Sequence, residues 1–405
     1  MLRWWIALSL AALLVACTTQ VPSATVPPTE TPTPTQTPIS TATPTLTPTP
    51  VVRSEPVAPI DPFAQARRLG RGVNLGNALE ANRGAVGSMQ LKAQYFQLIA
   101  EAGFDTIRVP IRWTSYASDQ PPYTVEEAFF QKVDWVIQSG LQQGLNVVID
   151  MHHYDELFAG VAGNHRGRFI AIWSQIATRY RNLPDSLFYE PLNEPHGVLL
   201  PDAWNALVRD TVAAIRRVDG VHTLVISGTE WGNMQGLTFL QIPEGEENVI
   251  CTFHYYEPFA FTHQGAGWVG EQYWTIGVEW PGPPKTPLVP KLAAQEDPFV
   301  RWWFHDYNTQ PAESNPCSPG EIAKQLDVAI ALGEKLGKPL WLGEFGAYRM
   351  GDMQSRVNWT SAVRQAAEAR GFPWAYWEFG DSFGVYDRAL EEWRRGLLQA
   401  LIPPD

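Results

Sequence analysis

The sequence is poor in cysteine, with three in 405 residues and no C-x-x-C motif. This scarcity argues against a structural zinc site, because such sites are built from closely spaced cysteines and histidines. Cys251 stands in an expected strand and Cys317 in a proline-rich segment. The sequence permits a disulfide between them but does not require one.

Clusters of lysine and arginine are also lacking, and the net charge is -12. Nucleic acid is therefore excluded as a partner, because its phosphates would be repelled. An uncharged or weakly charged substrate fits better. Tryptophan, in contrast, is abundant, with 17 residues. Most tryptophans are core residues, but their rings are also what sugar-binding clefts stack against pyranose faces.

The N-terminal apolar run, Trp4 to Val15, is too short to span a bilayer comfortably. It follows a short positive region and ends in L-V-A-C, which resembles a bacterial lipobox. We therefore expect residues 1–17 to be a lipoprotein signal peptide, with Cys17 as the lipid anchor on an extracellular or cell-surface protein. The alternative is an ordinary cleaved signal that happens to contain a cysteine.

A threonine- and proline-rich segment comes next, with 13 Thr and 9 Pro in residues 18–50. Such a composition cannot form a packed core, so residues 18–55 are expected to be a disordered linker. The sequence leaves open an extended spacer, a cleavable stalk or an O-glycosylated one. Residues 56–405 are expected to form one catalytic domain.

From about residue 56 the chain repeats a short β-rich run, a polar turn and an amphipathic helix. Eight runs alternate with helical stretches, which predicts an α/β fold, a (β/α)8 TIM barrel with a long loop after its sixth strand. Only the segment after the fifth run lacks a convincing helix. The expected strands are residues 71–76, 105–111, 146–152, 187–193, 222–228, 248–256, 339–346 and 373–380.

Active sites of such barrels lie at the C-terminal ends of the strands. Glu194 ends the fourth run and Glu344 the seventh, so two carboxylates should face each other across the mouth. Glycosidic bond cleavage needs such a pair, one protonated and one ionised. Glu190 has the same strand parity as Glu194 and is expected to be structural, one layer lower. Further polar residues end other runs: Asn77, Glu80, Arg108, His152, His153, Asn193, Glu230, His254, Tyr256, Trp377 and Glu378.

Several motifs occur in a fixed order: GVNLGNALE, AGFDTIRVPIRW, HHYDEL, LNEPHG, HYYEPFAFTHQGA, GEFGAYR and WAYWEFG. Through them the chain from about Leu69 to the C-terminus resembles the family 5 glycoside hydrolases of clan A. It looks most like thermophilic endo-β-1,4-glucanases that also cut mannans. The resemblance implies hydrolysis of internal linkages with retention of configuration, on glucans and on mannan or glucomannan, without a cofactor or metal.

The resemblance also implies roles for individual residues. Glu194 would be the acid/base and Glu344 the nucleophile, kept ionised by Arg108 and hydrogen-bonded by Tyr256. Asn193 would bind the sugar 2-hydroxyl, and His254 would tune Glu194. His152 and His153 would line the subsite that holds the distorted sugar, and Trp377 would be the stacking floor of that subsite.

For five more residues, the sequence leaves two roles open, subsite lining and loop support: Asn77, Glu80, His263, Trp268 and Glu378. The run D-M-H-H-Y-D, residues 150–155, could suggest metal ligands. Adjacent histidines on a strand point to opposite faces, which argues against that interpretation.

The long loop at 257–318 departs from the relatives in its second half, from 271 to 318, and leaves internal and chain-end cleavage as alternatives. Two further alternatives are a surface glycan-binding lipoprotein with a weak or inactive barrel and a metal-dependent hydrolase. The expected partner is polysaccharide alone, with a membrane reached only through Cys17 and the protein a monomer.

Overall fold

The computed structural model describes residues 60–85 and 88–404. The expected signal peptide, its lipobox and the threonine- and proline-rich linker lie outside the described residues. Within the described part, no helix is both long enough and apolar enough to cross a membrane.

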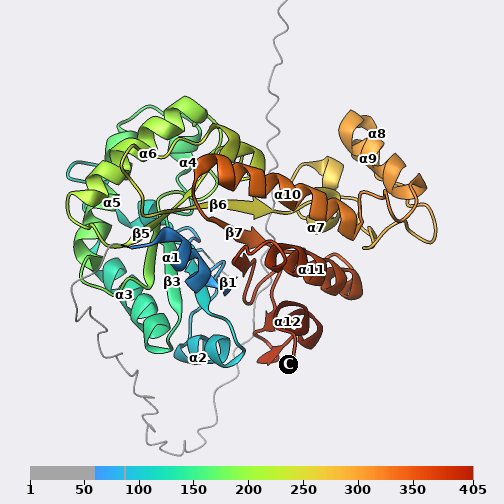
Figure 1. The fold of residues 1–405 in the computed structure, drawn as a ribbon, viewed down its shortest axis with the longest axis horizontal. Coiled ribbons are helices and arrows are strands. Elements are labelled where there is room, and N and C mark those ends of the chain that lie inside the picture. Colours follow the sequence, from blue (N-terminus) through green and yellow to red (C-terminus); the bar gives the residue numbers. More distant parts are fainter. Residues whose placement is uncertain (1–59, 86–87, 405) are drawn as a thin grey trace, which may run out of the picture. The chain divides into compact units, whose positions relative to one another are not determined.

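Eight parallel strands close into a barrel, with β1 hydrogen-bonded to both β2 and β8 (Figure 1). The prediction of a (β/α)8 barrel is therefore confirmed, and each strand lies inside the run expected for it. The strands are β1 (Arg71–Asn74), β2 (Thr106–Val109), β3 (Asn146–Asp150), β4 (Leu187–Glu190), β5 (Thr223–Ser227), β6 (Val249–Tyr255), β7 (Leu340–Phe345) and β8 (Trp374–Tyr376).

Six long helices follow strands and form the outer layer (Figure 1). They are α2 (Ala93–Glu101), α3 (Glu127–Gln142), α5 (His165–Tyr180), α6 (Pro201–Arg216), α10 (Pro319–Leu336) and α11 (Met353–Glu368). Local sequence sets their ends: Ser318 caps α10 ahead of Pro319, and Gly337 ends that helix in the left-handed conformation. Between β5 and β6 there is only the 3-10 helix η2 (Met234–Phe239), as the sequence predicted.

The remaining elements lie in connections or at the ends of the described chain. They are α1 (Pro62–Leu69), η1 (Trp113–Tyr116), α4 (Asp155–Phe158), α7 (Phe259–Thr262), η3 (Glu271–Tyr273), α8 (Leu292–Glu296), α9 (Pro298–Thr309), the hairpin β9 (Tyr386–Asp387) with β10 (Glu392–Trp393), and α12 (Arg395–Leu401). The long loop after β6 is thus a folded insertion, whose α8 and α9 project away from the barrel (Figure 1).

The barrel interior is built in layers. An apolar cluster joins Val148, Phe188 and Val225 of neighbouring strands to Ala66 and Leu69 of α1. Helix α1 therefore closes the N-terminal end of the barrel. Asp150 and Glu190 lie two positions further along β3 and β4, so the same strand parity turns their charged side chains inward.

The two cysteines of the described chain do not pair. Cys251 on β6 and Cys317 just before α10 are both buried free thiols. The disulfide that the sequence left open is therefore absent from this structure.

Candidate active site

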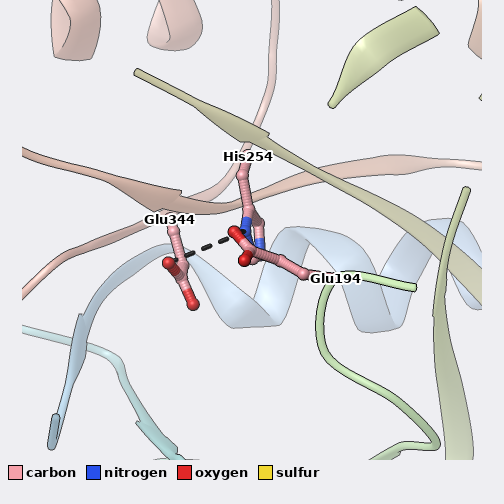
Figure 2. Close-up of side chains that lie close together, drawn as sticks. All are labelled: Glu194, His254 and Glu344. Atoms are coloured by element: carbon pink, nitrogen blue, oxygen red, sulfur yellow. Dashed lines mark hydrogen bonds and ion pairs between the residues drawn. The ribbon is translucent and has the colours of Figure 1, made fainter. Parts of the chain in front are cut away.

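Two glutamates and a histidine meet at the C-terminal ends of the strands. Glu344 lies on β7, His254 on β6, and Glu194 in the loop after β4. One oxygen of each carboxylate and one ring nitrogen all lie within 4.8 Å of one another. Figure 2 shows the three side chains pointing into a common space. The expected pairing of Glu194 with Glu344 is thus present in the fold.

Glu194 has the environment of a carboxylic acid that stays protonated near neutral pH. Its side chain is 28% exposed and one oxygen lies 2.8 Å from Nδ1 of His254. Burial raises its pKa to about 7; the charges of Glu190 and Asp150 add to the rise, while Arg108 opposes it. A group with this pKa can donate a proton at neutral pH.

Glu344 has more partners that favour its ionised form. Arg108 donates from Nη1 to Oε1 at 2.6 Å, and the Tyr256 hydroxyl donates to Oε2 at 2.7 Å. Burial raises the pKa of Glu344, whereas His254, Arg108 and the bond from Tyr256 oppose the rise. Because both of its oxygens accept hydrogen bonds, Glu344 is the better anion of the pair.

Arg108 on β2 is the fully buried centre of the site. Its guanidinium holds Glu190 through two bonds of 2.7 and 2.8 Å, and Nη2 lies 2.9 Å from Asp150. Glu190 therefore lies one layer below the glutamate pair, as its parity predicted. A single cation shared by three carboxylates, with Glu344 as the third, keeps this end of the barrel rich in negative charge.

Asn193 is oriented by Arg108, whose Nη2 donates to the amide oxygen at 2.8 Å. The amide nitrogen makes no hydrogen bond within the described chain. It is therefore free to donate to a bound molecule beside Glu194.

His152, His153 and Trp377 form an aromatic wall of the site. The rings of His152 and Trp377 are parallel, with centroids 5.5 Å apart, and His153 lies edge-on to His152 at 4.7 Å. The expectation that the two histidines point to opposite faces was wrong, because β3 ends at Asp150 and strand alternation no longer applies. Burial lowers the pKa of both rings, that of His153 to about 2, so both are neutral.

Asn77, Glu80 and Glu378 support loops. Both oxygens of buried Glu80 accept backbone N–H groups of its own loop, from Asn77 and Ala78. Fully buried Glu378 accepts from the Asn77 amide at 3.3 Å and from the backbone of Phe383 at 3.3 Å. Burial raises the pKa of Glu80 to about 7 and that of Glu378 to about 8. The contacts favour loop support over subsite lining for all three.

His263 and Trp268 belong to the loop after β6. His263 is buried, stacked on Phe259 at 4.0 Å and edge-on to Tyr256 at 5.0 Å. These contacts favour support of Tyr256 over subsite lining. Trp268 is 60% exposed and packs edge-on against Tyr348 at 4.9 Å, so its ring is available to a ligand.

Sequence reasoning missed Asp150, Asn74 and Trp231. Asn74 accepts a hydrogen bond from Arg108 at 2.9 Å. Asp150 lies two positions after inward-facing Val148 on the same strand, so strand parity alone predicts that it faces inward. Trp231 is 57% exposed, and its ring stacks on that of His196 with centroids 5.1 Å apart. His196 comes two residues after Glu194. Glu230, expected at the mouth, is exposed, and its side chain makes no hydrogen bond or ion pair within the described chain.

Glu194, His254 and Glu344 have the spacing of a three-ligand metal site. The donor set does not suit a cation, because both oxygens of Glu344 already accept hydrogen bonds and the Arg108 cation lies 2.6 Å away. The geometry suits a carboxylate pair that works on opposite sides of a bond.

Comparison with known proteins agrees with this geometry. Endoglucanase H of Acetivibrio thermocellus is 28% identical over 344 residues, which are 84% of this chain but only 33% of that relative. Endoglucanase Cel5A of Thermotoga maritima is 40% identical, with a TM-score of 0.74, and the match covers 85% of this chain and all of that one. The structure of that Cel5A with mannotriose matches at 41% identity, 84% and 100% coverage and a TM-score of 0.73. The cellulase family profile, glycosyl hydrolase family 5, matches residues 71–382. The chain therefore belongs to glycosyl hydrolase family 5.

Proposed function

We propose that the protein is an endo-β-1,4-glucanase that cleaves by double displacement with retention. The observation that carries this proposal is the approach of Glu194 and Glu344 to within 4.8 Å. Retaining glycosidases hold their carboxyl groups about 5 to 5.5 Å apart, and inverting ones leave room for a water at about 6.5 Å or more. The separation therefore supports direct covalent capture of the sugar.

The two carboxyl groups divide the work. Glu344 attacks the anomeric carbon, and Glu194 gives its proton to the departing glycosidic oxygen. Glu194 then takes a proton from water, which attacks the anomeric carbon and releases Glu344. Asn193 donates to the 2-hydroxyl, a contact that strengthens as positive charge develops on the ring.

Cleavage of internal linkages and action on mannan belong to the same proposal. Exposed Trp231 beside the Glu194 loop and exposed Trp268 beyond Tyr256 offer stacking surfaces away from the scissile bond, which supports binding of a long chain. The likeness to the Cel5A structure with mannotriose supports a site that tolerates manno units as well as gluco units.

A substrate panel tests the proposal. We expect the purified domain, residues 56–405, to release a range of oligosaccharides from carboxymethyl cellulose, mixed-linkage β-glucan and glucomannan, and none from xylan. Proton NMR should show the β-anomer as the first product. Activity on glucans but on no mannan would refute the dual specificity, release of a single short product would refute internal cleavage, and a first product of α configuration would refute retention.

For the N-terminal region we propose a lipoprotein signal at residues 1–17, a linker at 18–55 and a catalytic domain at 56–405, held at the cell surface as a monomer. The motif L-V-A-C before Cys17 supports the anchor. We expect Cys17→Ser to move the enzyme from the membrane fraction to the soluble fraction of the expressing bacterium, with unchanged specific activity. The anchor is wrong if the wild-type protein is already soluble there.

A further inference from the structure

Asp150, the last residue of β3, is a fully buried carboxylate that shares Arg108 with Glu344, and its hydrogen-bond and ion-pair partners include neither Glu194 nor Glu344. Its Oδ1 accepts the backbone N–H of Ile111 at 2.9 Å. Its Oδ2 lies 2.9 Å from Nη2 of Arg108 and 2.7 Å from Nδ1 of His152. Two of these three partners can only donate, so Asp150 is built to accept on both oxygens.

This arrangement determines where the proton of His152 lies. A neutral imidazole carries one N–H, and the partner of one nitrogen decides the state of the other. Ionised Asp150 can only accept, so Nδ1 of His152 must donate to it and Nε2 must be the unprotonated nitrogen. Burial raises the pKa of Asp150 to about 6, so this state holds above that pH.

Nε2 of His152 makes no hydrogen bond within the described chain, and the ring lies parallel to Trp377 in the wall of the site. The neighbouring donors are already engaged: Tyr256 donates to Glu344, and Arg108 is shared among carboxylates and amide oxygens. Asn193 presents a free donor. Nε2 of His152 is therefore a neutral hydrogen-bond acceptor in a site whose other polar groups are hydrogen-bond donors and carboxyl groups.

We propose that Asp150 is a positioning residue that holds His152 in the Nδ1–H tautomer, so that Nε2 accepts a hydrogen bond from a hydroxyl of the bound sugar. The sugar in this statement rests on the proposed function, whereas the tautomer does not. The charged or titratable groups around Asp150 are Arg108 on β2, Glu190 on β4, His254 on β6, Glu80 in the first loop, Glu194 and His152 itself.

Nitrogen-15 NMR of the histidine rings tests the tautomer in the wild-type protein, without substrate. The chain has eight histidines, and the signals of His152 are assigned by their absence from a His152→Ala variant. Well above the pKa of Asp150, we expect a protonated Nδ1 and an unprotonated Nε2. A protonated Nε2 in the wild type would overturn the proposal, whether or not the protein cleaves glucan.

Asp150→Asn tests the consequence. An amide nitrogen facing His152 would donate to Nδ1 and move the proton to Nε2, which would then meet the sugar hydroxyl as a second donor. We expect kcat/KM on cello-oligosaccharides to fall about 10- to 100-fold, with His152 shifted toward the Nε2–H form. In a His152→Ala background the same substitution should lower kcat/KM by less than about threefold. An equal loss in both backgrounds would show that Asp150 does not act through His152.

The matched control is Asp219→Asn. Asp219 is also buried and also holds a histidine, with Oδ2 at 2.6 Å from Nδ1 of His222 and a bond from Tyr189, but it lies just before β5 at the opposite end of the barrel. We expect Asp219→Asn to lower Tm while leaving kcat/KM and the His152 signals unchanged. A comparable loss of kcat/KM in this control would make the Asp150 effect one of stability and overturn the proposal.

Discussion

Glu344→Gln is expected to lower kcat on soluble β-glucan at least about 10⁴-fold, because an amide cannot form the covalent glycosyl-enzyme. The fold should survive, since the amide oxygen can still accept from Arg108 or Tyr256. The amide nitrogen must then face a donor, so a small drop in Tm is expected as well. Reducing-end assays measure kcat, and circular dichroism measures Tm.

Mass spectrometry makes this prediction specific to Glu344. An activated 2-deoxy-2-fluoro-β-cellobioside should label the wild-type protein once, on the peptide that contains Glu344, and should not label Glu344→Gln. The matched control is Glu334→Gln on the exposed side of α10, which should change neither kcat nor labelling. Label on any other carboxylate would assign the nucleophile elsewhere.

Glu194→Ala is expected to lower kcat/KM on β-glucan about 10²- to 10⁴-fold, the usual contribution of general acid catalysis. The loss should be much smaller for the first step on a cellobioside with a good aryl leaving group, which departs without a proton. Because the pKa of Glu194 is about 7, wild-type activity on glucan should fall as pH rises through 7. That alkaline fall should be absent from the residual activity of the variant.

Added azide distinguishes loss of the acid/base from general damage. The small anion can enter the space left by the carboxylate and attack the glycosyl-enzyme from that side, so the product should be the β-glycosyl azide. Glu230→Ala, an exposed glutamate in the loop after β5, serves as the control and should need no rescue. Glu194 is not the proton donor if azide restores no activity to Glu194→Ala and if kcat/KM falls as much on aryl glycosides as on glucan.

The sequence predicted the barrel and the central pair because both depend on simple periodicities. Strand alternation placed Glu190 inside the barrel, where it binds Arg108, and the ends of β4 and β7 brought Glu194 and Glu344 together. The two histidines lie beside Trp377 as predicted, but their expected opposite orientation was wrong, because β3 ends two residues earlier than its apolar pattern suggested.

Residues that support the site were harder to predict, because their partners are remote in the chain. The bond between Asn77 and Glu378 joins residues 301 positions apart, across the first and last loops of the barrel. Nothing in either local sequence marks that contact. Trp231 was missed because it lies beside η2, where no helical or strand pattern predicted a structure.

The position of helix α1 has a consequence for where a fusion partner can be attached to the domain. The helix covers the floor of the barrel: Thr106 and Asn146, at the starts of β2 and β3, donate to the carbonyls of Leu69 and Arg68. The described chain thus begins on the side away from Glu194 and Glu344. A fusion partner joined ahead of α1 would therefore be attached behind the working face, on the opposite side from the mouth that a polymer strand must enter.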